Sequence, residues 1–574
     1  MWNKKEQKDI KTVAYWCSSC KIPVIRPKSE KETCPICGKR MKFLSNTLRP
    51  VFPAEERLIE LLTNKKIEKD DIVWKGKSTY YINGKSLRIT NNQKVYADDK
   101  MLRKELLNKK FDFDKFNNNI DLFVKANKEH LDYITQEAIE FIQDESLKYD
   151  IKNTMVSFSG GKDSTVVSDL VCKALPNKKI IHLFSDTTLE IQSTYDYVER
   201  LKNNKQIEMH IARNNDNNFM DMAKKIGPPT MAGRWCCYMF KTGALNRKMN
   251  EIFNGRVLTF YGVRRSESAT RANYNRVEEK TESVKIANQR SSAPILYWTD
   301  LEVWLYILVN KIDFNVAYKY GYNRVGCYCC PNATISSELM ERIYNHKKYY
   351  AWTDYLREFG KQCNKDDLDD YVLQGRWKMR NGGLGVKAAS TVKIKATDCT
   401  AEENGKIYEL QKDINSSFFN LFLPFGYLQE GRKEIDETLV LHPVSKIPII
   451  SLQPLGKRKI KIVTINAKNP RSLHSRLAYQ VVKYNACNQC LKCESLCRFG
   501  AITCLPNKYE INNEKCKRCQ ACVNPKYLSG GCLMCRYLRT KKEAQWLLTL
   551  IIHLHLLENQ DKSIKQLKLI ENMV

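Results

Sequence analysis

The stretch that most constrains the fold is the run Ser-Phe-Ser-Gly-Gly-Lys-Asp-Ser at residues 157–164. Residues 154–156 before it fit the end of a buried strand, and residues 165–171 after it have the apolar spacing of a helix. Gly160 and Gly161 can adopt a positive φ, so that successive backbone N–H groups turn toward one point at the helix N-terminus. The run therefore predicts an anion-binding turn between a strand and a helix.

Side chains of this run add further donors, namely Lys162 and the hydroxyls of Ser159 and Ser164. The spacing differs from the Walker pattern, which places four residues between its first glycine and the Gly-Lys pair. It resembles instead the PP-loop of ATP pyrophosphatases, which holds the β- and γ-phosphates of ATP and leaves the α-phosphate open to attack. A plain glycine-rich turn is the alternative reading of the two glycines alone. The nucleotide-binding residues predicted in the run are Ser157, Ser159, Gly160, Gly161, Lys162, Asp163 and Ser164.

Charge and cysteine content narrow the class of protein. At 574 residues the chain exceeds one ordinary core, and its formal net charge of +31 favours nucleic acid as a partner. A lysine-rich proteome is the alternative explanation of that charge. The N-terminus lacks a signal-peptide core, and the apolar run at 546–557 is short for a membrane span, so we expect a cytoplasmic protein without membrane contact. In that reducing compartment, 22 closely grouped cysteines indicate metal ligation rather than disulfides.

The first cysteine group consists of two Cys-x-x-Cys knuckles, formed by Cys17 with Cys20 and by Cys34 with Cys37. Four thiolates at this spacing suit tetrahedral zinc, and so small a domain needs a metal because it buries little apolar surface. The group resembles a zinc ribbon; rubredoxin-type iron is the second choice.

Predicted strands and helices alternate from residue 151 onward, which indicates a doubly wound parallel sheet. The strands that follow the first are predicted at 179–184, 206–212 and 256–263. Ligands of such sheets bind at the carboxyl ends of the strands, so we expect the loops after these strands to meet a nucleotide.

Several motifs of this region together resemble the phosphoadenosine phosphosulfate reductase family over about residues 150 to 380. They are the phosphate loop, Asp186-Thr187, Trp235-Cys236-Cys237, Gly262 with Arg264 and Arg271, Pro294 with Trp298-Thr299-Asp300, and Gly326-Cys327. The resemblance implies that Asp186 and Thr187 lie near the adenosine. It also implies that Gly262, Arg264 and Arg271 belong to the nucleotide site, with a structural ion pair as the alternative role of the two arginines.

Two cysteine pairs lie within the same region: Cys236 with Cys237, and Cys327 with Cys330. An adjacent pair plus a Cys-x-x-Cys resembles the [4Fe-4S] pattern of adenylyl-sulfate reductases and of the related DNA phosphorothioation enzymes. Zinc or a redox-active thiol is the alternative.

Two further cysteine runs resemble a two-cluster bacterial ferredoxin, in which the last cysteine of each run ligates the other cluster. The first run is Cys487, Cys490, Cys493 and Cys497, and the second is Cys516, Cys519 and Cys522. The second run departs from the pattern because Lys526 stands at its fourth position, and either Cys532 or Cys535 could supply the missing ligand. A normal cluster, a labile cluster and a zinc site all remain open for it. One to three [4Fe-4S] clusters are thus expected in the chain.

We therefore expect a multidomain α/β protein whose central doubly wound parallel sheet, of the adenine nucleotide α-hydrolase type, is flanked by a zinc ribbon and a ferredoxin-like α+β domain. The expected segments are a zinc ribbon at 1–50, a hairpin and helical spacer at 51–150, the reductase-like domain at 151–335, a helical extension at 336–380, a small α+β module at 381–480, the ferredoxin-type domain at 481–536 and a helical tail at 537–574.

The family resemblance implies two chemistries, and the phosphate loop favours one of them. Reductases of adenylylated sulfate cleave no pyrophosphate, and their loops depart from the intact pattern seen here. We therefore expect an iron–sulfur enzyme that binds Mg²⁺–ATP, releases pyrophosphate and activates an acceptor, tRNA or DNA, for sulfur transfer from a donor protein. Its catalytic residues are predicted to be Lys162, Asp163 and Ser164. The alternatives are a reductase of adenylyl sulfate or its 3′-phosphate, fed with electrons by the ferredoxin domain, and a non-catalytic redox or nucleic-acid-binding protein.

Overall fold

The computed structural model describes residues 12–28, 33–107, 109–176, 178–231, 233–279, 286–379, 394–505, 508–523 and 534–536. The chain divides into two compact units. The first unit contains residues 1–214 and 244–379, and the second contains residues 215–243 and 380–574. The predicted helical tail at 537–574 and the predicted ligand Cys532 lie outside the described residues.

A six-stranded sheet forms the centre of the first unit, in the order β10-β9-β8-β11-β13-β12. Its first five strands pair in parallel, and only β12 runs antiparallel to its neighbour β13. The predicted doubly wound parallel sheet is thereby confirmed. The strands are β8 (Thr154–Phe158), β9 (Ile180–Asp186), β10 (Ile207–Arg213), β11 (Val257–Tyr261), β12 (Val277–Glu278) and β13 (Gln289–Ser292).

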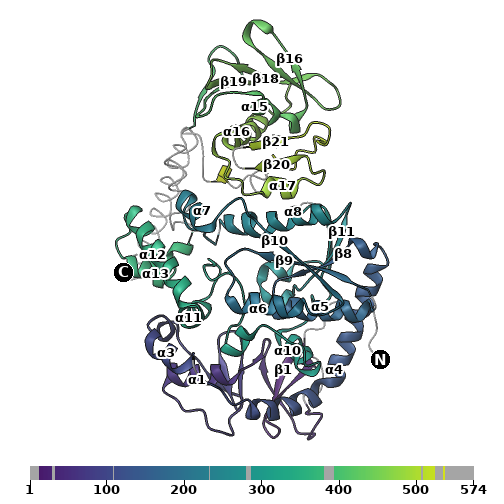
Figure 1. Ribbon diagram of the computed structural model, residues 1–574, viewed down its shortest axis with the longest axis vertical. Coiled ribbons are helices and arrows are strands. Elements are labelled where there is room, and N and C mark those ends of the chain that lie inside the picture. Colours follow the sequence, from purple (N-terminus) through teal and green to yellow (C-terminus); the bar gives the residue numbers. More distant parts are fainter. Residues whose placement is uncertain are drawn as a thin grey trace, which may run out of the picture. The chain divides into compact units, whose positions relative to one another are not determined.

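Helices cover both faces of this sheet because successive strand residues point to opposite sides. Met155 of β8 belongs to an apolar cluster with α8, whereas its neighbour Val156 belongs to the cluster that contains α5 and α10. Figure 1 shows α8 on one side of the strands and α5 with α6 on the other. The helices are α5 (Lys162–Ala174), α6 (Gln192–Leu201), α8 (Gly243–Ile252), α9 (Ala269–Ala272) and α10 (Asp300–Val309).

The remaining elements of the first unit are two small sheets and several helices, which come before and after the central sheet along the chain. Two small antiparallel sheets have the orders β2-β1-β3 and β4-β5-β6-β7. Their strands are β1 (Thr12–Cys17), β2 (Ile22–Pro27), β3 (Lys42–Ser45), β4 (Arg49–Pro50), β5 (Val73–Lys75), β6 (Tyr80–Ile82) and β7 (Lys85–Leu87). The helices are α1 (Pro53–Thr63), α2 (Asn91–Val95), α3 (Asp99–Leu106), α4 (Asp114–Ser146), α11 (Ile335–Tyr344), α12 (His346–Gln362) and α13 (Leu368–Leu373).

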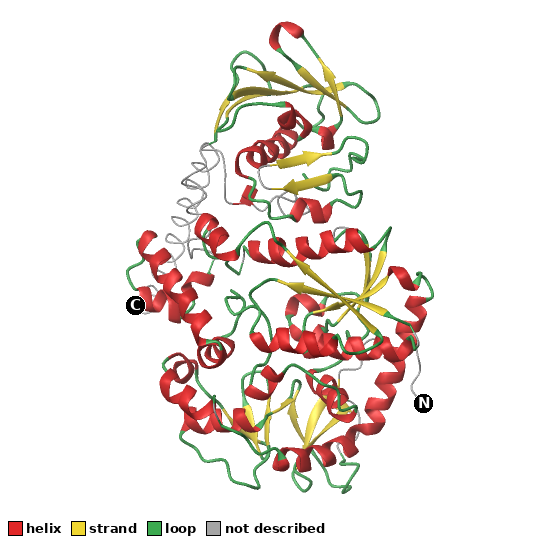
Figure 2. Cartoon of the chain, viewed as in Figure 1, coloured by secondary structure: helices red, strands yellow, loops and turns green. Residues whose placement is uncertain are grey.

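The second unit is built on a six-stranded antiparallel sheet and a separate hairpin, both drawn as yellow arrows in Figure 2. The sheet has the order β14-β15-β19-β18-β17-β16, and the hairpin joins β20 to β21. The strands are β14 (Lys395–Asp398), β15 (Gly405–Glu409), β16 (Tyr427–Glu430), β17 (Thr438–Leu441), β18 (Pro448–Pro454), β19 (Lys459–Thr464), β20 (Ile502–Leu505) and β21 (Lys508–Ile511). The helices are α7 (Phe219–Ile226), the π-helical η3 (Cys237–Thr242), α15 (Ser416–Asn420), α16 (Pro470–Ala486) and α17 (Lys492–Leu496).

One apolar core of the second unit contains both sheet residues and cysteines of the ferredoxin-like runs. Ile450 of β18 and Leu477 of α16 are fully buried in it, together with the buried thiol of Cys493. Within the described residues, no helix is long and apolar enough to cross a membrane.

Candidate nucleotide site and cysteine groups

The strand order of the central sheet reverses between β8 and β11, and this is where doubly wound sheets bind their ligands. The predicted phosphate loop follows β8 and leads directly into α5, which begins at Lys162. The loop after β11 begins at Gly262 and leads into a short 3-10 turn at Arg265–Glu267. The two predicted nucleotide-binding loops therefore lie side by side.

The phosphate loop adopts a defined turn. Gly160 has a φ of 70°, whereas Gly161 caps the helix with a φ of −95°, so only Gly160 uses the positive φ that glycine permits. The backbone N–H of Ser159 donates to the hydroxyl of Ser164 over 3.2 Å, and that hydroxyl donates to the carbonyl of Gly161 over 2.8 Å. These bonds cross the loop and fix its shape at the N-terminus of α5.

Gly262 allows the second loop to approach the first. A Cβ atom at this position would lie 2.6 Å from the backbone carbon of Asp163 and from the backbone nitrogen of Ser164. Such a distance is far below ordinary van der Waals contact, and the clashing atoms are backbone. Glycine is therefore required here for close approach and not for a special φ.

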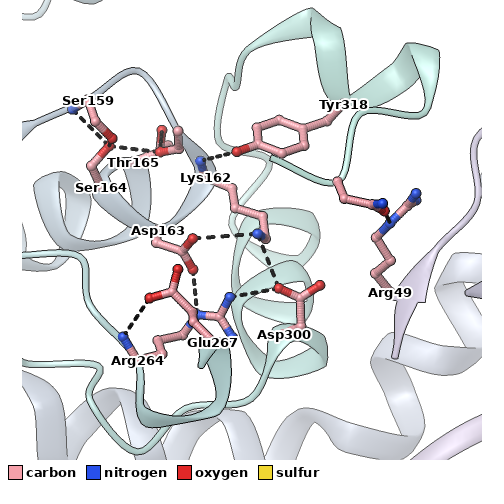
Figure 3. Close-up of polar contacts among 12 residues, drawn as sticks. Arg49, Ser159, Lys162, Asp163, Ser164, Thr165, Arg264, Glu267, Asp300 and Tyr318 are labelled. Carbon is pink, nitrogen blue, oxygen red and sulfur yellow. Dashed lines mark hydrogen bonds and ion pairs between the residues drawn. The ribbon is translucent and has the colours of Figure 1, made fainter. Parts of the chain in front are cut away.

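Four charged side chains converge beside the phosphate loop, as Figure 3 shows. The ammonium group of Lys162 lies 3.1 Å from Asp300 and 3.5 Å from Asp163. Arg264 donates to the same two carboxylates, through Nε to Asp163 over 2.6 Å and through Nη2 to Asp300 over 2.8 Å. Two cations and two anions thus form one alternating cluster.

The cluster is held in its ionised form. Burial alone would raise the pKa of Asp163, but Arg264 and Lys162 outweigh burial and lower that pKa to about 2. Burial would likewise lower the pKa of Lys162, but the carboxylates of Asp163 and Asp300 outweigh it and raise the pKa above its usual value. Lys162 is therefore a permanent, nearly buried cation at the start of the helix that follows the phosphate loop.

Tyr318, from a third segment of the chain, also contacts the phosphate loop. Its hydroxyl accepts the backbone N–H of Lys162 over 3.0 Å, and the Lys162 ammonium lies 5.5 Å from the centre of its ring. Sequence reasoning did not assign a role to Tyr318, because it lies in a 3-10 turn (Val316–Tyr320) far along the chain. Asp300 is expected from the sequence only as part of a family motif, without a role of its own. The capping box of α10 at Thr299, with Glu302 three residues later, marks the helix start that places Asp300.

Asp186, Thr187 and Arg271 each bond to neighbouring residues outside the charged cluster. Asp186, at the end of β9, accepts hydrogen bonds from Tyr195 over 3.0 Å and from Nε of Arg213 over 2.8 Å. Thr187 donates to Glu190 over 2.7 Å. Arg271 pairs with Glu267 and not with the charged cluster around Lys162.

The N-terminal cysteines form a compact tetrad. The Sγ atoms of Cys17, Cys20, Cys34 and Cys37 all lie within 4.8 Å of one another. The separations of 3.5 Å between Cys17 and Cys37 and of 3.9 Å between Cys20 and Cys34 match the roughly 3.8 Å edge of a tetrahedron with 2.3 Å zinc–sulfur bonds. A backbone hydrogen bond from Lys39 lowers the pKa of Cys37 to about 7, which favours a thiolate ligand. The tetrad therefore fits the predicted zinc ribbon.

The ferredoxin-like runs fold together in the second unit. A solvent-open hollow is lined by four thiols, one from the first run and three from the second. They belong to Cys497, Cys516, Cys519 and Cys522. A set of four thiols around one hollow suits an iron–sulfur cluster. Cys497, the last cysteine of the first run, lies among the cysteines of the second run, as the ferredoxin pattern predicts.

The other four predicted cluster ligands divide between the two units. Cys327 and Cys330 belong to the first unit, where the Cys327 thiol lies 3.5 Å from the hydroxyl of Thr187. Cys236 and Cys237 belong to the second unit, in which η3 packs against α17 of the first ferredoxin-like run. Their assignment to one cluster stays a prediction.

The glycine loop at the reversal point of the parallel sheet defines a nucleotide-binding α/β protein of the PP-loop type. The family model of the phosphoadenosine phosphosulfate reductase domain matches residues 153–333. An adenosine 5′-phosphosulfate reductase of Staphylococcus haemolyticus is 33% identical over 189 residues, which cover 32% of this chain and 72% of that protein. The chain therefore belongs to the phosphoadenosine phosphosulfate reductase family.

A relative that matches more of the chain is the uncharacterized protein MJ0066 of Methanocaldococcus jannaschii. It is 34% identical over 277 residues, which cover 47% of this chain. The match covers 54% of that relative, so the chain spans about half of its length.

Solved structures are similar to only part of the chain. The phosphoadenylyl-sulfate reductase of Candida auris has a TM-score of 0.27 and 21% identity and covers 35% of this chain and 95% of its own. The U34-tRNA thiolase NcsA of Methanococcus maripaludis, solved with its [4Fe-4S] cluster, has a TM-score of 0.26 and 15% identity and covers 43% of this chain and 79% of its own.

Proposed function

We propose that the protein is an iron–sulfur enzyme that uses ATP, releases pyrophosphate and adenylylates an acceptor on nucleic acid before sulfur replaces the acceptor oxygen. The observation that carries the proposal is the phosphate loop, whose Ser-Gly-Gly-Lys-Asp-Ser sequence has every residue of the PP-loop pattern. Its Lys162 is nearly buried. A phosphate loop with a fixed cation stabilises pyrophosphate as a leaving group.

Each part of the charged cluster has a role in this reaction. The acceptor oxygen attacks the α-phosphorus of ATP, the bond from that phosphorus to the bridging oxygen breaks, and pyrophosphate leaves with its electron pair. Lys162 and the N-terminus of α5 neutralise the charge that develops on pyrophosphate. Asp163 and Asp300 hold Lys162 and Arg264 in place, and their oxygens suit the Mg²⁺ that accompanies ATP.

Adenylylation makes the later sulfur transfer feasible because AMP is a far better leaving group than oxide or hydroxide. The net charge of +31 supports a nucleic-acid acceptor. Cysteine groups in the second unit would hold [4Fe-4S] clusters, which supply electron transfer or a site for sulfur.

The proposal is tested with anaerobically purified, cluster-loaded protein, Mg²⁺–ATP, inorganic sulfide as the sulfur source, and either total tRNA or DNA. We expect AMP and pyrophosphate to form in equal amounts with one of the two polymers. Lys162→Met should abolish this reaction, whereas Lys173→Met, on an exposed face of the same helix, should leave it near the parental rate. Absence of AMP and pyrophosphate with both polymers would refute the proposal.

A second candidate is a reductase that releases sulfite from adenylyl sulfate or its 3′-phosphate. It is favoured by the 33% identity to a protein named adenosine 5′-phosphosulfate reductase over 72% of that protein. The ferredoxin-like runs would then supply electrons. Sulfite release from either nucleotide, without pyrophosphate formation from ATP, would establish this candidate instead.

A further inference from the structure

A buried ion pair lies in the part of the first unit that precedes the central sheet along the chain. Arg49 on β4 and Glu55 on α1 are 4% and 0% exposed, and both Nη atoms of Arg49 donate to the Glu55 carboxylate over 2.7 Å. The same carboxylate also accepts Lys75 over 2.9 Å and the Tyr80 hydroxyl over 2.8 Å. Such a buried pair adds little net stability over apolar packing, so its fixed geometry is the more informative property.

The Arg49 guanidinium also binds a distant segment of the same unit. Its Nε donates to Oδ1 of Asn323 over 2.8 Å, and its Nη2 donates to the carbonyl of Gly321 over 3.4 Å. Gly321 has a φ of 102°, and a Cβ there would lie 3.2 Å from the Glu55 side chain, which is tighter than ordinary packing. The turn at residues 321–323 therefore rests directly on the ion pair.

The other end of this segment contacts the phosphate loop. Gly321 ends the 3-10 turn Val316–Tyr320, and its N–H donates to the carbonyl of Tyr318 over 3.1 Å. The Tyr318 hydroxyl accepts the N–H of Lys162 over 3.0 Å, and the amide of Asn315 donates to the carbonyl of Gly160 over 3.4 Å. Tyr318 and Asn315 are 2% and 0% exposed, so water does not compete for these bonds. One segment thus joins the ion pair to the loop.

We propose that Arg49 is a positioning residue for the phosphate loop, which acts through the segment 315–323 and the Tyr318 hydroxyl. Figure 3 shows the segment that carries Tyr318 between Arg49 and Lys162. A planar guanidinium suits this role because its donors have a fixed geometry, whereas the ammonium group of lysine is a point charge on a flexible stem. The assignment concerns the loop of the proposed function and does not depend on the reaction that follows nucleotide binding.

A purely structural ion pair is the competing explanation. It predicts a general loss of stability when Arg49 is changed, without a special effect at the phosphate loop. Arg342→Lys is the matched control, because Arg342 is 7% exposed and pairs with Asp99 over 2.6 Å. Arg342 also donates to the carbonyls of Lys94 and Val95, each over 2.9 Å, and not to the segment 315–323.

The test measures hydrogen–deuterium exchange, resolved to single backbone amides, in the full-length protein. The parent is compared with Arg49→Lys, Tyr318→Phe, the double variant and Arg342→Lys. Arg49→Lys keeps a positive charge beside Glu55 but loses the fork of donors that reaches Asn323 and Gly321. Equilibrium dialysis of ATP with the same proteins provides a second readout.

We expect the Lys162 amide to exchange about tenfold faster in Tyr318→Phe, which removes its acceptor, and at least about threefold faster in Arg49→Lys. The double variant should match Tyr318→Phe, because Arg49 acts on this amide only through the Tyr318 hydroxyl. ATP affinity should fall in Arg49→Lys and in Tyr318→Phe, again without a further loss in the double variant. Arg342→Lys should keep the parental exchange at Lys162, and the amides of β9 should be equally protected in Arg49→Lys and Arg342→Lys.

Three results would overturn the assignment: parental exchange of the Lys162 amide in folded Arg49→Lys, additive effects in the double variant, or an equal rise in Arg342→Lys. If Arg49→Lys does not fold, Asn323→Ala replaces it, because this change removes the Nε contact and leaves the pair with Glu55. Parental exchange at Lys162 in Asn323→Ala would also overturn the assignment. A parent that binds no ATP would refute the proposed function, whereas the exchange comparison would still decide the role of Arg49.

Discussion

Gly262→Ala is the most informative single change in the nucleotide site. The added Cβ would lie 2.6 Å from backbone atoms of Asp163 and Ser164, and ordinary contact begins at 3.4 Å. One of the two loops must therefore move by about 0.8 Å. A displacement near 1 Å at a catalytic site lowers rates by about a hundredfold, so we expect a loss of that order in ATP-dependent pyrophosphate release.

The assay measures ATP binding by equilibrium dialysis and pyrophosphate release under the same anaerobic conditions. Gly326→Ala is the control, because a Cβ there meets nothing within 4 Å. We expect ATP affinity to fall at least about tenfold in Gly262→Ala and to stay within about twofold in the control. Melting curves of both variants separate a loop effect from unfolding. Parental ATP affinity and activity in a folded Gly262→Ala protein would refute the close-approach reasoning.

Three further predictions concern the charge cluster, a core histidine and the ribbon. Asp300→Asn removes one of the two negative charges that balance Lys162 and Arg264. It should therefore lower the melting temperature by several degrees without ligand, and by less with saturating pyrophosphate. An equal loss in both conditions would contradict this. Burial lowers the pKa of His182 from 6.5 to about 4. Between these pH values the unfolded chain binds a proton that the folded chain does not, so the free energy of unfolding falls by about 3 kcal/mol as the pH drops from 6.5 toward 4. Chemical unfolding at several pH values should show this slope reduced in His182→Gln, and an unchanged slope would refute it. Cys37→Ser should remove one equivalent of zinc per chain, measured by mass spectrometry of the metal, and retention of that zinc would exclude the tetrad.

The sequence allowed the central sheet and its phosphate loop to be predicted because both depend on local patterns. Alternating apolar runs predicted the order of strands and helices, and the run at residues 157–164 predicted where the loop would lie. Of the two glycines at which the sequence permits a positive φ, Gly160 uses it, whereas Gly161 has a φ of −95°, which any residue can adopt. A glycine pair in a sequence shows that positive φ is permitted and not where it is used.

The parts of the site that sequence reasoning missed depend on contacts between distant segments. Tyr318 meets the loop across more than 150 residues, and Asp300 joins it from the first turn of α10. Neither residue type is unusual at its position, so only the folded arrangement reveals its partner.

Domain boundaries and the cluster formed by Cys236, Cys237, Cys327 and Cys330 stay predictions. The first two cysteines and the last two belong to different compact units. Iron counting on a Cys237→Ser variant, alone and combined with Cys330→Ser, would test their common cluster: equal iron loss in the single and double variants is the result expected of one shared site.

The most direct test of the central claim is a side-by-side turnover measurement on one preparation of cluster-loaded protein. One arm contains α-labelled ATP, inorganic sulfide and the acceptor, and the other contains adenylyl sulfate and dithionite as the reductant. The intact loop and its buried Lys162 predict acceptor-dependent formation of labelled AMP with pyrophosphate, and no sulfite from adenylyl sulfate. Sulfite release from adenylyl sulfate, with ATP left unchanged in the presence of every acceptor tested, would contradict it.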